Sequence, residues 1–201
     1  MIAADIILNL AIFLSTTLLL GGLRRRTVKD HPEQFREALR FFTCQSNILC
    51  SLSALVTAFF RMSGPVPEWA WILKYTGTAA VTVTMLTVFL FLAPSVGKGW
   101  YGALLKGPSN LFMHLLTPLA ALVSFCIFEK RGMTFPQCLF GMLPVLLYGP
   151  LYLNRILYAP EEKRWDDFYG FNRNGKWPAM FAIMMAGTFI MCLGLMAVQN
   201  L

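Results

Sequence analysis

The sequence predicts an all-α integral membrane protein built as one bundle of six transmembrane helices. The chain has 201 residues, of which 57% are hydrophobic and only 13% are charged. Soluble domains carry about 25% charged residues, so this composition excludes an ordinary soluble domain. Six apolar stretches are long enough, or nearly so, to cross a hydrocarbon core of roughly 30 Å. They cover residues 2–20, 39–60, 71–93, 109–128, 137–158 and 178–198, approximately.

The gaps between these stretches are short, so we expect residues 1–201 to form a single transmembrane domain. No basic residue precedes the first stretch, and we therefore expect a retained helix and not a cleaved signal peptide. Before the second stretch, Asp30-His31-Pro32-Glu33 has the pattern of a helix start with proline in the first turn. This pattern predicts a short amphipathic helix on the membrane surface, with His31 in solvent.

The remaining boundaries are marked by proline and glycine. Residues 62–67 (Met-Ser-Gly-Pro-Val-Pro) predict a turn after the second helix, and Trp69 and Trp71 fit an interfacial aromatic belt. Residues 93–97 (Ala-Pro-Ser-Val-Gly) predict the end of the third helix. Gly107 and Pro108 precede Ser109, a candidate N-cap of the fourth helix.

The distribution of basic residues predicts how the chain lies in the membrane. Of the seventeen Lys and Arg, thirteen lie in or beside the first, third and fifth connections, and four beside the second and fourth. Positive charge is retained in the cytoplasm, so we expect both termini on the non-cytoplasmic side of the cell membrane. The net charge of +7 is then explained by anionic lipid head groups, and no basic domain indicates nucleic-acid binding.

The longest connection, residues 159–177, combines aromatic residues with charges and glycines. It follows the fifth helix on the face where the second and fourth helices begin. Two interpretations stay open, a solvated anchor loop and a lid over a site.

Two of the helices carry small and polar residues at helical spacing. On the second helix the stripe is Thr43, Asn47, Cys50, Ala54 and Thr57, and on the fourth it is Asn110, His114, Thr117, Ala121 and Ser124. Such stripes often do no more than pack membrane helices together. A histidine inside the membrane is costly, however, and indicates a functional site.

Thr43 and His114 are the candidate catalytic pair. Each lies about five residues inside its helix, roughly 7 Å below a shared membrane face at 1.5 Å per residue. A neutral imidazole takes a proton from a hydroxyl in nucleophilic catalysis, and threonine requires such a base. Gln45, Ser46 and Asn47, with Asn110 on the other helix, are candidate hydrogen-bond donors to a developing oxyanion. His114 has no second ligand at metal-binding spacing, so we expect neither a metal nor a cofactor.

The segments Phe42-Thr43-Cys44-Gln45-Ser46-Asn47 and His114-x-x-x-Pro118 resemble a group of small six-helix bacterial membrane proteins. These are similar to the eukaryotic androgen-induced proteins, which are intramembrane threonine hydrolases. The resemblance implies that Thr43 and His114 are the catalytic pair and that the substrates are fatty acid esters of hydroxy fatty acids. Only these two short motifs are specific, and the loop after the fifth helix is unlike that of the eukaryotic hydrolases.

The reaction and the substrate stay open at this point. Another related branch looks like a cysteine-dependent acyltransferase, and Cys44 adjoins Thr43. Adjacent helical residues point about 100° apart, so only one of them faces His114. Arg40, Arg155 and Lys176 are candidates to hold a substrate carboxylate or head group, and anchoring to lipid phosphates is the simpler interpretation.

Two non-enzymatic interpretations also stay open. A passive lipid-binding or transport protein would use the same polar stripes, and a purely structural bundle would use them for packing. Ion-coupled carriers usually need a carboxylate buried in the membrane. Of the ten acidic residues, only Asp5 lies within a predicted helix, which argues against such a carrier.

The oligomeric state is not predicted. Cys126 and Cys138 lie near the ends of adjacent helices and could form a disulfide, but buried apolar thiols are the simpler expectation.

Overall fold

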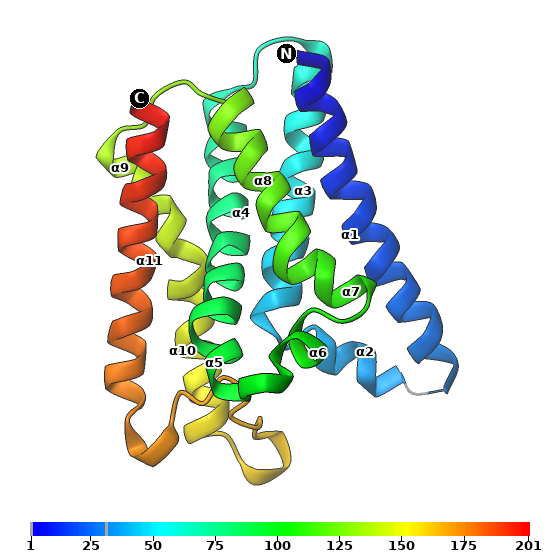
Figure 1. Cartoon of the computed structure of the whole chain (residues 1–201), viewed down its shortest axis with the longest axis vertical. Coiled ribbons are helices and arrows are strands. Elements are labelled where there is room, and N and C mark those ends of the chain that lie inside the picture. The colour runs from blue at the N-terminus through cyan, green and yellow to red at the C-terminus, as the bar shows by residue number, and fades with distance from the viewer. Residues whose placement is uncertain (1, 31) are drawn as a thin grey trace.

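The computed structural model describes the backbone of residues 2–30 and 32–201, and the side chains of residues 2–23 and 35–201. His31, expected to be solvated, lies outside the described residues. Over the described part the chain is helical without strands, and six helices are long and apolar enough to cross a membrane. The all-α bundle is thus confirmed (Figure 1).

The six candidate spans agree with the predicted stretches to within a few residues at most boundaries. They are Ile2–Leu23, Phe42–Ser63, Glu68–Leu104, Pro108–Phe128, Phe135–Leu157 and Trp177–Asn200. The first lies in α1 (Ile2–Asp30), the second is α3 (Phe42–Ser63) and the sixth is α11 (Trp177–Asn200). The expected surface helix before the second span is α2 (Pro32–Ala38).

The other three spans are assembled from consecutive helical segments. The third consists of α4 (Glu68–Thr87), η1 (Val88–Leu92), α5 (Ala93–Val96), η2 (Gly97–Gly99) and α6 (Trp100–Leu104). The fourth consists of α7 (Pro108–Leu111), η3 (Phe112–Leu116), α8 (Thr117–Val123) and η4 (Ser124–Phe128). The fifth consists of α9 (Phe135–Cys138), η5 (Leu139–Met142) and α10 (Leu143–Leu157), and two short turns, η6 (Glu161–Lys163) and η7 (Arg173–Gly175), follow it.

The predicted end of the third helix at residues 93–97 is confirmed: α5 ends at Val96, and Gly97, with a φ of 70° and a ψ of −142°, lies outside the helical region. A proline cannot donate to the carbonyl four residues back, and Pro94 is accommodated by the wider π-helical turn of η1 before it. The chain then continues through α5 to α6, which turns away from the axis of α4 at one end of the bundle (Figure 1).

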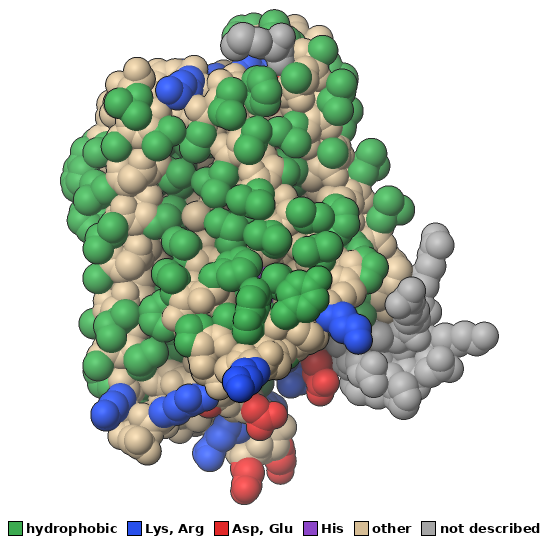
Figure 2. Space-filling view, in the orientation of Figure 1, with side chains coloured by type: hydrophobic (Ala, Val, Ile, Leu, Met, Phe, Trp, Pro, Cys, Tyr) green, Lys and Arg blue, Asp and Glu red, His purple; other side chains and the backbone are tan. Residues whose placement is uncertain are grey.

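The bundle has two different ends. Both termini lie at one end, here called the terminal face, and α2, α6, α7 and the loop of residues 158–176 lie at the other, the loop face (Figure 1). Hydrophobic side chains cover the middle of the surface, whereas most charged side chains in view lie at the loop face (Figure 2). This pattern fits a multi-pass membrane protein.

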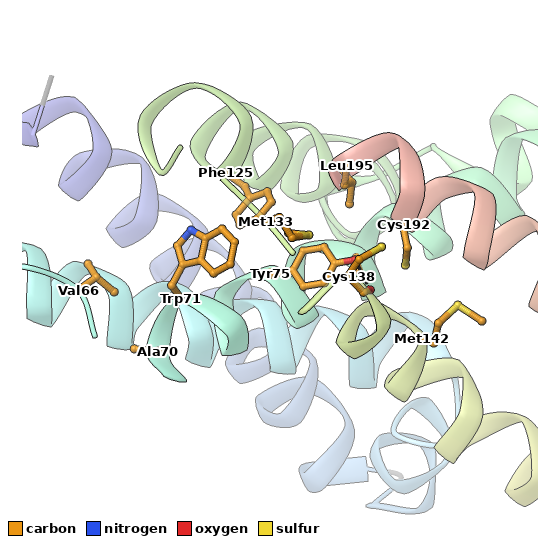
Figure 3. Packing of buried hydrophobic residues seen from close by; sticks show 11 residues of the cluster. Val66, Ala70, Trp71, Tyr75, Phe125, Met133, Cys138, Met142, Cys192 and Leu195 are labelled. Atoms are coloured by element: carbon orange, nitrogen blue, oxygen red, sulfur yellow. Dashed lines mark hydrogen bonds between the residues drawn. The ribbon is translucent and has the colours of Figure 1, made fainter. Parts of the chain in front are cut away.

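Packing is densest around α4, which contacts α3, α8, α10 and α11. Toward the terminal face Trp71 and Tyr75 pack on Phe125, with ring centroids 5.4 and 5.5 Å apart (Figure 3). The α3–α4 contact depends on Gly77, because a Cβ there would lie 2.9 Å from the Cα of Cys50. Small residues in membrane helices permit such close approach. All five cysteines are free, and Cys138 and Cys192 belong to this core.

Candidate active site at the loop face

The candidate site lies where α3 begins. Thr43 is the second residue of this helix and forms part of the wall of a cavity between α3, α4, α10, α11 and the loop. The cavity encloses about 560 Å³ of space, counted with its open mouth. Its walls are largely aliphatic and aromatic: Phe42, Thr43, Val83, Thr84, Thr87, Val88, Leu92, Val145, Tyr148, Gly149, Tyr152, Tyr169, Phe171, Phe181 and Met184.

A second, smaller hollow adjoins this cavity between η1 and α11. It shares Thr87, Leu92, Tyr169, Phe171 and Met184 with the cavity and adds Phe91, Met180 and Ile183. The side chains of Phe91 and Ile183 are 39% and 51% exposed. Because they lie within candidate spans, this exposure would face lipid. The smaller hollow thus lies between the cavity and two exposed apolar side chains of these spans.

The phenol of Tyr169 closes the cavity beside Thr43. Its oxygen accepts a hydrogen bond from the backbone N–H of Phe42 at 3.0 Å, at the N-terminus of α3, where helices leave N–H groups unpaired. Burial raises the pKa of Tyr169 to about 12, and hydrogen-bonding groups of Phe42 and Thr43 oppose part of this rise. The phenol thus keeps its proton at neutral pH and can donate a hydrogen bond next to the Thr43 side chain.

The loop that carries Tyr169 is held on the bundle by polar contacts. Asp167 accepts hydrogen bonds from the Tyr152 hydroxyl at 2.9 Å and from the backbone N–H groups of Phe171 and Asn172 at 2.8 Å each. The Tyr152 hydroxyl in turn accepts from the N–H of Tyr169 at 3.2 Å. Part of the loop covers the cavity, since Tyr169 and Phe171 belong to its wall, whereas residues 160–164 and 173–176 are exposed; both interpretations stay open.

His114 is held by the connection between the third and fourth spans. Its Nδ1 lies 2.6 Å from the backbone oxygen of Leu104, at the end of α6. A carbonyl oxygen can only accept, so Nδ1 carries the proton in this contact. The neutral ring then has its lone pair on Nε2, which is the form that a general base requires.

The backbone around His114 is an opened helical turn. Pro118 lacks the N–H that would bind the His114 carbonyl four residues back, and the chain forms the π-helical segment η3 there. The His-x-x-x-Pro spacing in the sequence thus has a structural reason.

The helices that carry Thr43 and His114 both begin at the loop face, but the two side chains are not in contact. Within the described residues no hydrogen bond joins them, and His114 is not part of the cavity wall. Asn47 connects the two helices instead. Its Nδ2 donates to the backbone carbonyl oxygen of Thr43 at 2.8 Å and to the backbone carbonyl oxygen of Met113 at 3.1 Å.

The other predicted polar groups are divided between structure and surface. The Ser46 hydroxyl is paired with the Thr84 hydroxyl at 2.8 Å, behind the cavity wall. Gln45 is exposed and donates to the Leu39 oxygen at 3.0 Å, so we leave it out of the proposed oxyanion site. Asn110 makes only a long contact of 3.5 Å with the Ala103 oxygen.

The two neighbouring residues Thr43 and Cys44 are oriented differently. Cys44 is only 7% exposed and is absent from the cavity wall, whereas Thr43 forms part of it. The 100° step along the helix therefore turns Thr43, not Cys44, toward the space that a substrate would enter.

Two of the three candidate cations meet at an aromatic ring. The guanidinium carbons of Arg40 and Arg155 lie 5.9 and 5.8 Å from the centre of the Trp165 ring, within cation–π range. The Nε of Arg155 is buried and has no hydrogen-bond partner among the described residues. Lys176 is exposed, and no side-chain contact joins it to this pair within the described part.

Tyr169 and Trp165 were not among the predicted site residues. Both lie in the aromatic loop of residues 159–177, but its composition does not reveal which ring reaches Thr43 or the arginines. Within the described residues, no group of three or more His, Cys, Asp and Glu side chains could hold a metal ion. Comparison with protein-family models, with curated proteins and with solved structures found no match.

Proposed function

We propose that this protein is an intramembrane hydrolase of fatty acid esters that uses Thr43 as the nucleophile and His114 as the base. The observation that carries the proposal is the position of Thr43 in the wall of a cavity whose other walls are largely aliphatic and aromatic, beside a hollow that borders exposed apolar side chains. The tautomer of His114 and the protonated phenol of Tyr169 support it. With the positive-inside orientation, the site lies in the cytoplasmic leaflet of the cell membrane.

The reaction would follow the usual course of nucleophilic acyl transfer. The Thr43 oxygen attacks the ester carbonyl while His114 Nε2 takes its proton, and Tyr169 donates a hydrogen bond to the oxyanion. Collapse expels the alcohol, which receives the proton from His114. Water, deprotonated by the same nitrogen, then attacks the carbonyl of the acyl–threonine ester. The bond to Thr43 Oγ1 breaks, Oγ1 receives the proton back from His114, and the fatty acid is released.

This mechanism requires His114 and Thr43 to approach. Catalytic hydrogen bonds are often long in structures without substrate and tighten only in the reacting complex. The opened turn of η3 and the single contact of the ring with Leu104 leave His114 Nε2 free of described partners. Closure of the gap on substrate binding is therefore part of the proposal.

The test is turnover of fatty esters by the purified protein and its variants. Thr43→Ala should abolish turnover, and His114→Ala should reduce it by about 10²–10⁴-fold, the usual contribution of a general base. The double variant should be little worse than Thr43→Ala, because residues that act as one unit are not additive. Cys44→Ala is the matched control, and retained turnover is expected.

The opposite pattern, turnover in Thr43→Ala and loss in Cys44→Ala, would replace the hydrolase with a cysteine-dependent acyltransferase. A second candidate function is passive lipid binding, which is favoured by the absence of His114 from the cavity wall. It predicts that the wild type binds a fatty ester but turns none over, and that Thr43→Ala binds it equally well.

A further inference from the structure

A second group of polar side chains is buried near the terminal face, far along the bundle from Thr43. Its members come from four different spans or their ends: Asp5, Asn9, Arg61, Lys74, Ser124 and Glu129. Asp5 is 1%, Lys74 0% and Glu129 2% exposed. Of the acidic residues, only Asp5 was expected within a helix. The structure buries Glu129 as well, directly after the fourth span.

Each carboxylate in this group faces one cation, but not equally well. Arg61 Nε donates to Asp5 Oδ2 at 2.8 Å, which is a direct ion pair. Lys74 Nζ lies 3.7 Å from Glu129 Oε1, beyond hydrogen-bond distance, and instead donates to Asn9 Oδ1 at 2.6 Å. Glu129 is thus the less well compensated of the two carboxylates.

The two carboxyl groups share the same donors. Asn9 Nδ2 lies 2.9 Å from Asp5 Oδ1 and 3.0 Å from Glu129 Oε1. The Ser124 hydroxyl is 3.2 Å from Asp5 Oδ1 and also contacts Glu129 Oε1 closely. A hydroxyl has a single proton to donate, so one of the two Ser124 contacts needs its hydrogen from a carboxyl group.

A further atom in the cluster lacks a partner. Glu129 Oε2 is buried and has no hydrogen bond within the described part of the chain. An ionised carboxylate with one buried oxygen left unpaired is costly, and two carboxylates that share a site disfavour double ionisation. A protonated carboxyl removes both penalties and supplies the hydrogen that the second Ser124 contact requires.

We propose that Asp5 and Glu129, bridged by Ser124, form a proton-binding site inside the terminal half of the bundle. The ligand is a single proton: hydronium gives it to a carboxylate and leaves as water, and the carboxylate becomes a carboxylic acid. Entry from the aqueous phase is short, because Glu129 is followed directly by the exposed Lys130.

The surrounding charges make the site responsive to pH. The charged groups around it are Arg61 from α3, Lys74 from α4 and, from the loop after η4, Arg131, which interacts electrostatically with Glu129. On α11, the uncharged Gln199 donates to the Phe125 oxygen. The thiols of Cys50 and Cys126 also interact electrostatically with Glu129. With both carboxylates ionised, the Asp5, Glu129, Arg61 and Lys74 charges cancel. Uptake of the proton leaves one excess positive charge and weakens the attraction of Lys74 for Glu129.

This site has consequences for the first helix. Among the side chains of α1 that the structure describes, those of residues 2–23, the buried ones are Asp5, Asn9, Ile12 and Thr16, and three of these four are polar. Polar contacts therefore contribute to the docking of α1, and protonation of Asp5 would weaken its ion pair with Arg61. Buried acidic groups that exchange protons are typical of relays and couplings in membrane proteins. The site is independent of the proposed hydrolase chemistry at the loop face.

The test is infrared difference spectroscopy of the whole protein in lipid vesicles during an acid titration. A buried carboxylic acid gives a carbonyl band that shifts when H₂O is replaced by D₂O. The band should appear above the range in which exposed carboxyls titrate, about pH 4. Asp5→Asn and Glu129→Gln should each remove it. Glu68→Gln, which changes an exposed carboxylate near the same face, should leave it unchanged.

A labelled wild type covers the case in which these variants fail to fold. Carbon-13 in the side-chain carboxyl of all Glu or of all Asp residues should shift the same band to lower frequency. The proposal is overturned if no such band precedes titration of the exposed carboxyls. It is also overturned if the band persists in both Asp5→Asn and Glu129→Gln; the cluster would then be a permanently ionised clamp.

Discussion

The side-chain amide of Asn47 donates a 3.1 Å hydrogen bond to the backbone oxygen of Met113, the residue before His114. The same nitrogen donates to the backbone carbonyl oxygen of Thr43 at 2.8 Å. One side chain thus fixes the distance between the helix of the proposed nucleophile and the helix of the proposed base.

We therefore expect Asn47→Ala to reduce kcat by about 10²-fold, because displacement of catalytic groups by about 1 Å costs that much. KM should change much less. Steady-state kinetics on a fatty ester measure both quantities. Gln45→Ala is the control, because Gln45 lies on an exposed side of the same helix, and this variant should behave like the wild type. Unchanged kcat in Asn47→Ala would show that the spacing of α3 and η3 does not matter for turnover.

Tyr169→Phe should lower kcat by about 10²–10³-fold, the loss typical for one oxyanion donor. The pKa of Tyr169, raised to about 12 by burial, means that the phenol keeps its proton below that pH and loses it only above. The pH–rate profile should accordingly show no fall from this group between neutral and mildly alkaline pH. A Tyr169→Phe variant with full kcat would remove the phenol from the mechanism.

Gly149→Ala should shift the substrate preference toward shorter acyl chains. A Cβ at Gly149 would lie 2.5 Å from Cε2 of Phe181, so the Phe181 ring would be pushed into the cavity. We expect kcat/KM for a long chain to fall about 10-fold relative to a short one, since one methylene in an apolar pocket has that effect. Competition between esters of different length measures this ratio.

The matched control is Gly187→Ala on α11, where an added Cβ would meet nothing within 4 Å. The double variant Gly149→Ala/Phe181→Ala should recover long-chain turnover, because it restores the space. Equal loss for all chain lengths in Gly149→Ala would mean that this part of the cavity does not hold the acyl chain.

Arg155→Ala should raise KM for an ester that carries a free carboxylate by about 10-fold or more, as expected for loss of a charge-assisted hydrogen bond. KM for the methyl ester of the same compound should be unchanged. Arg155 lies in α10, and Lys163→Ala, an exposed cation on the loop that follows, is the control. An equal rise in KM for both compounds would assign Arg155 to the loop structure and not to substrate recognition.

The six helices were predictable from the sequence because long apolar segments leave few alternatives in a bilayer, where every backbone group must be paired internally. Thr43 and His114 were singled out for the same reason, since polar groups in apolar segments are costly enough to stand out. The step of 100° per residue also distinguished Thr43 from Cys44, and the cavity wall contains only the former.

Contacts between distant segments were decided by the tertiary structure alone. The reach of Tyr169 to the start of α3, and of Arg40 and Arg155 to Trp165, depends on how a nineteen-residue loop folds back, which no helical period encodes. The separation of His114 from Thr43 depends on the packing of η3. Asp5, Lys74 and Glu129 lie near the ends of separate helices, where the sequence alone suggests exposure. Only the packing of four spans around them removes them from water and makes their charges depend on one another.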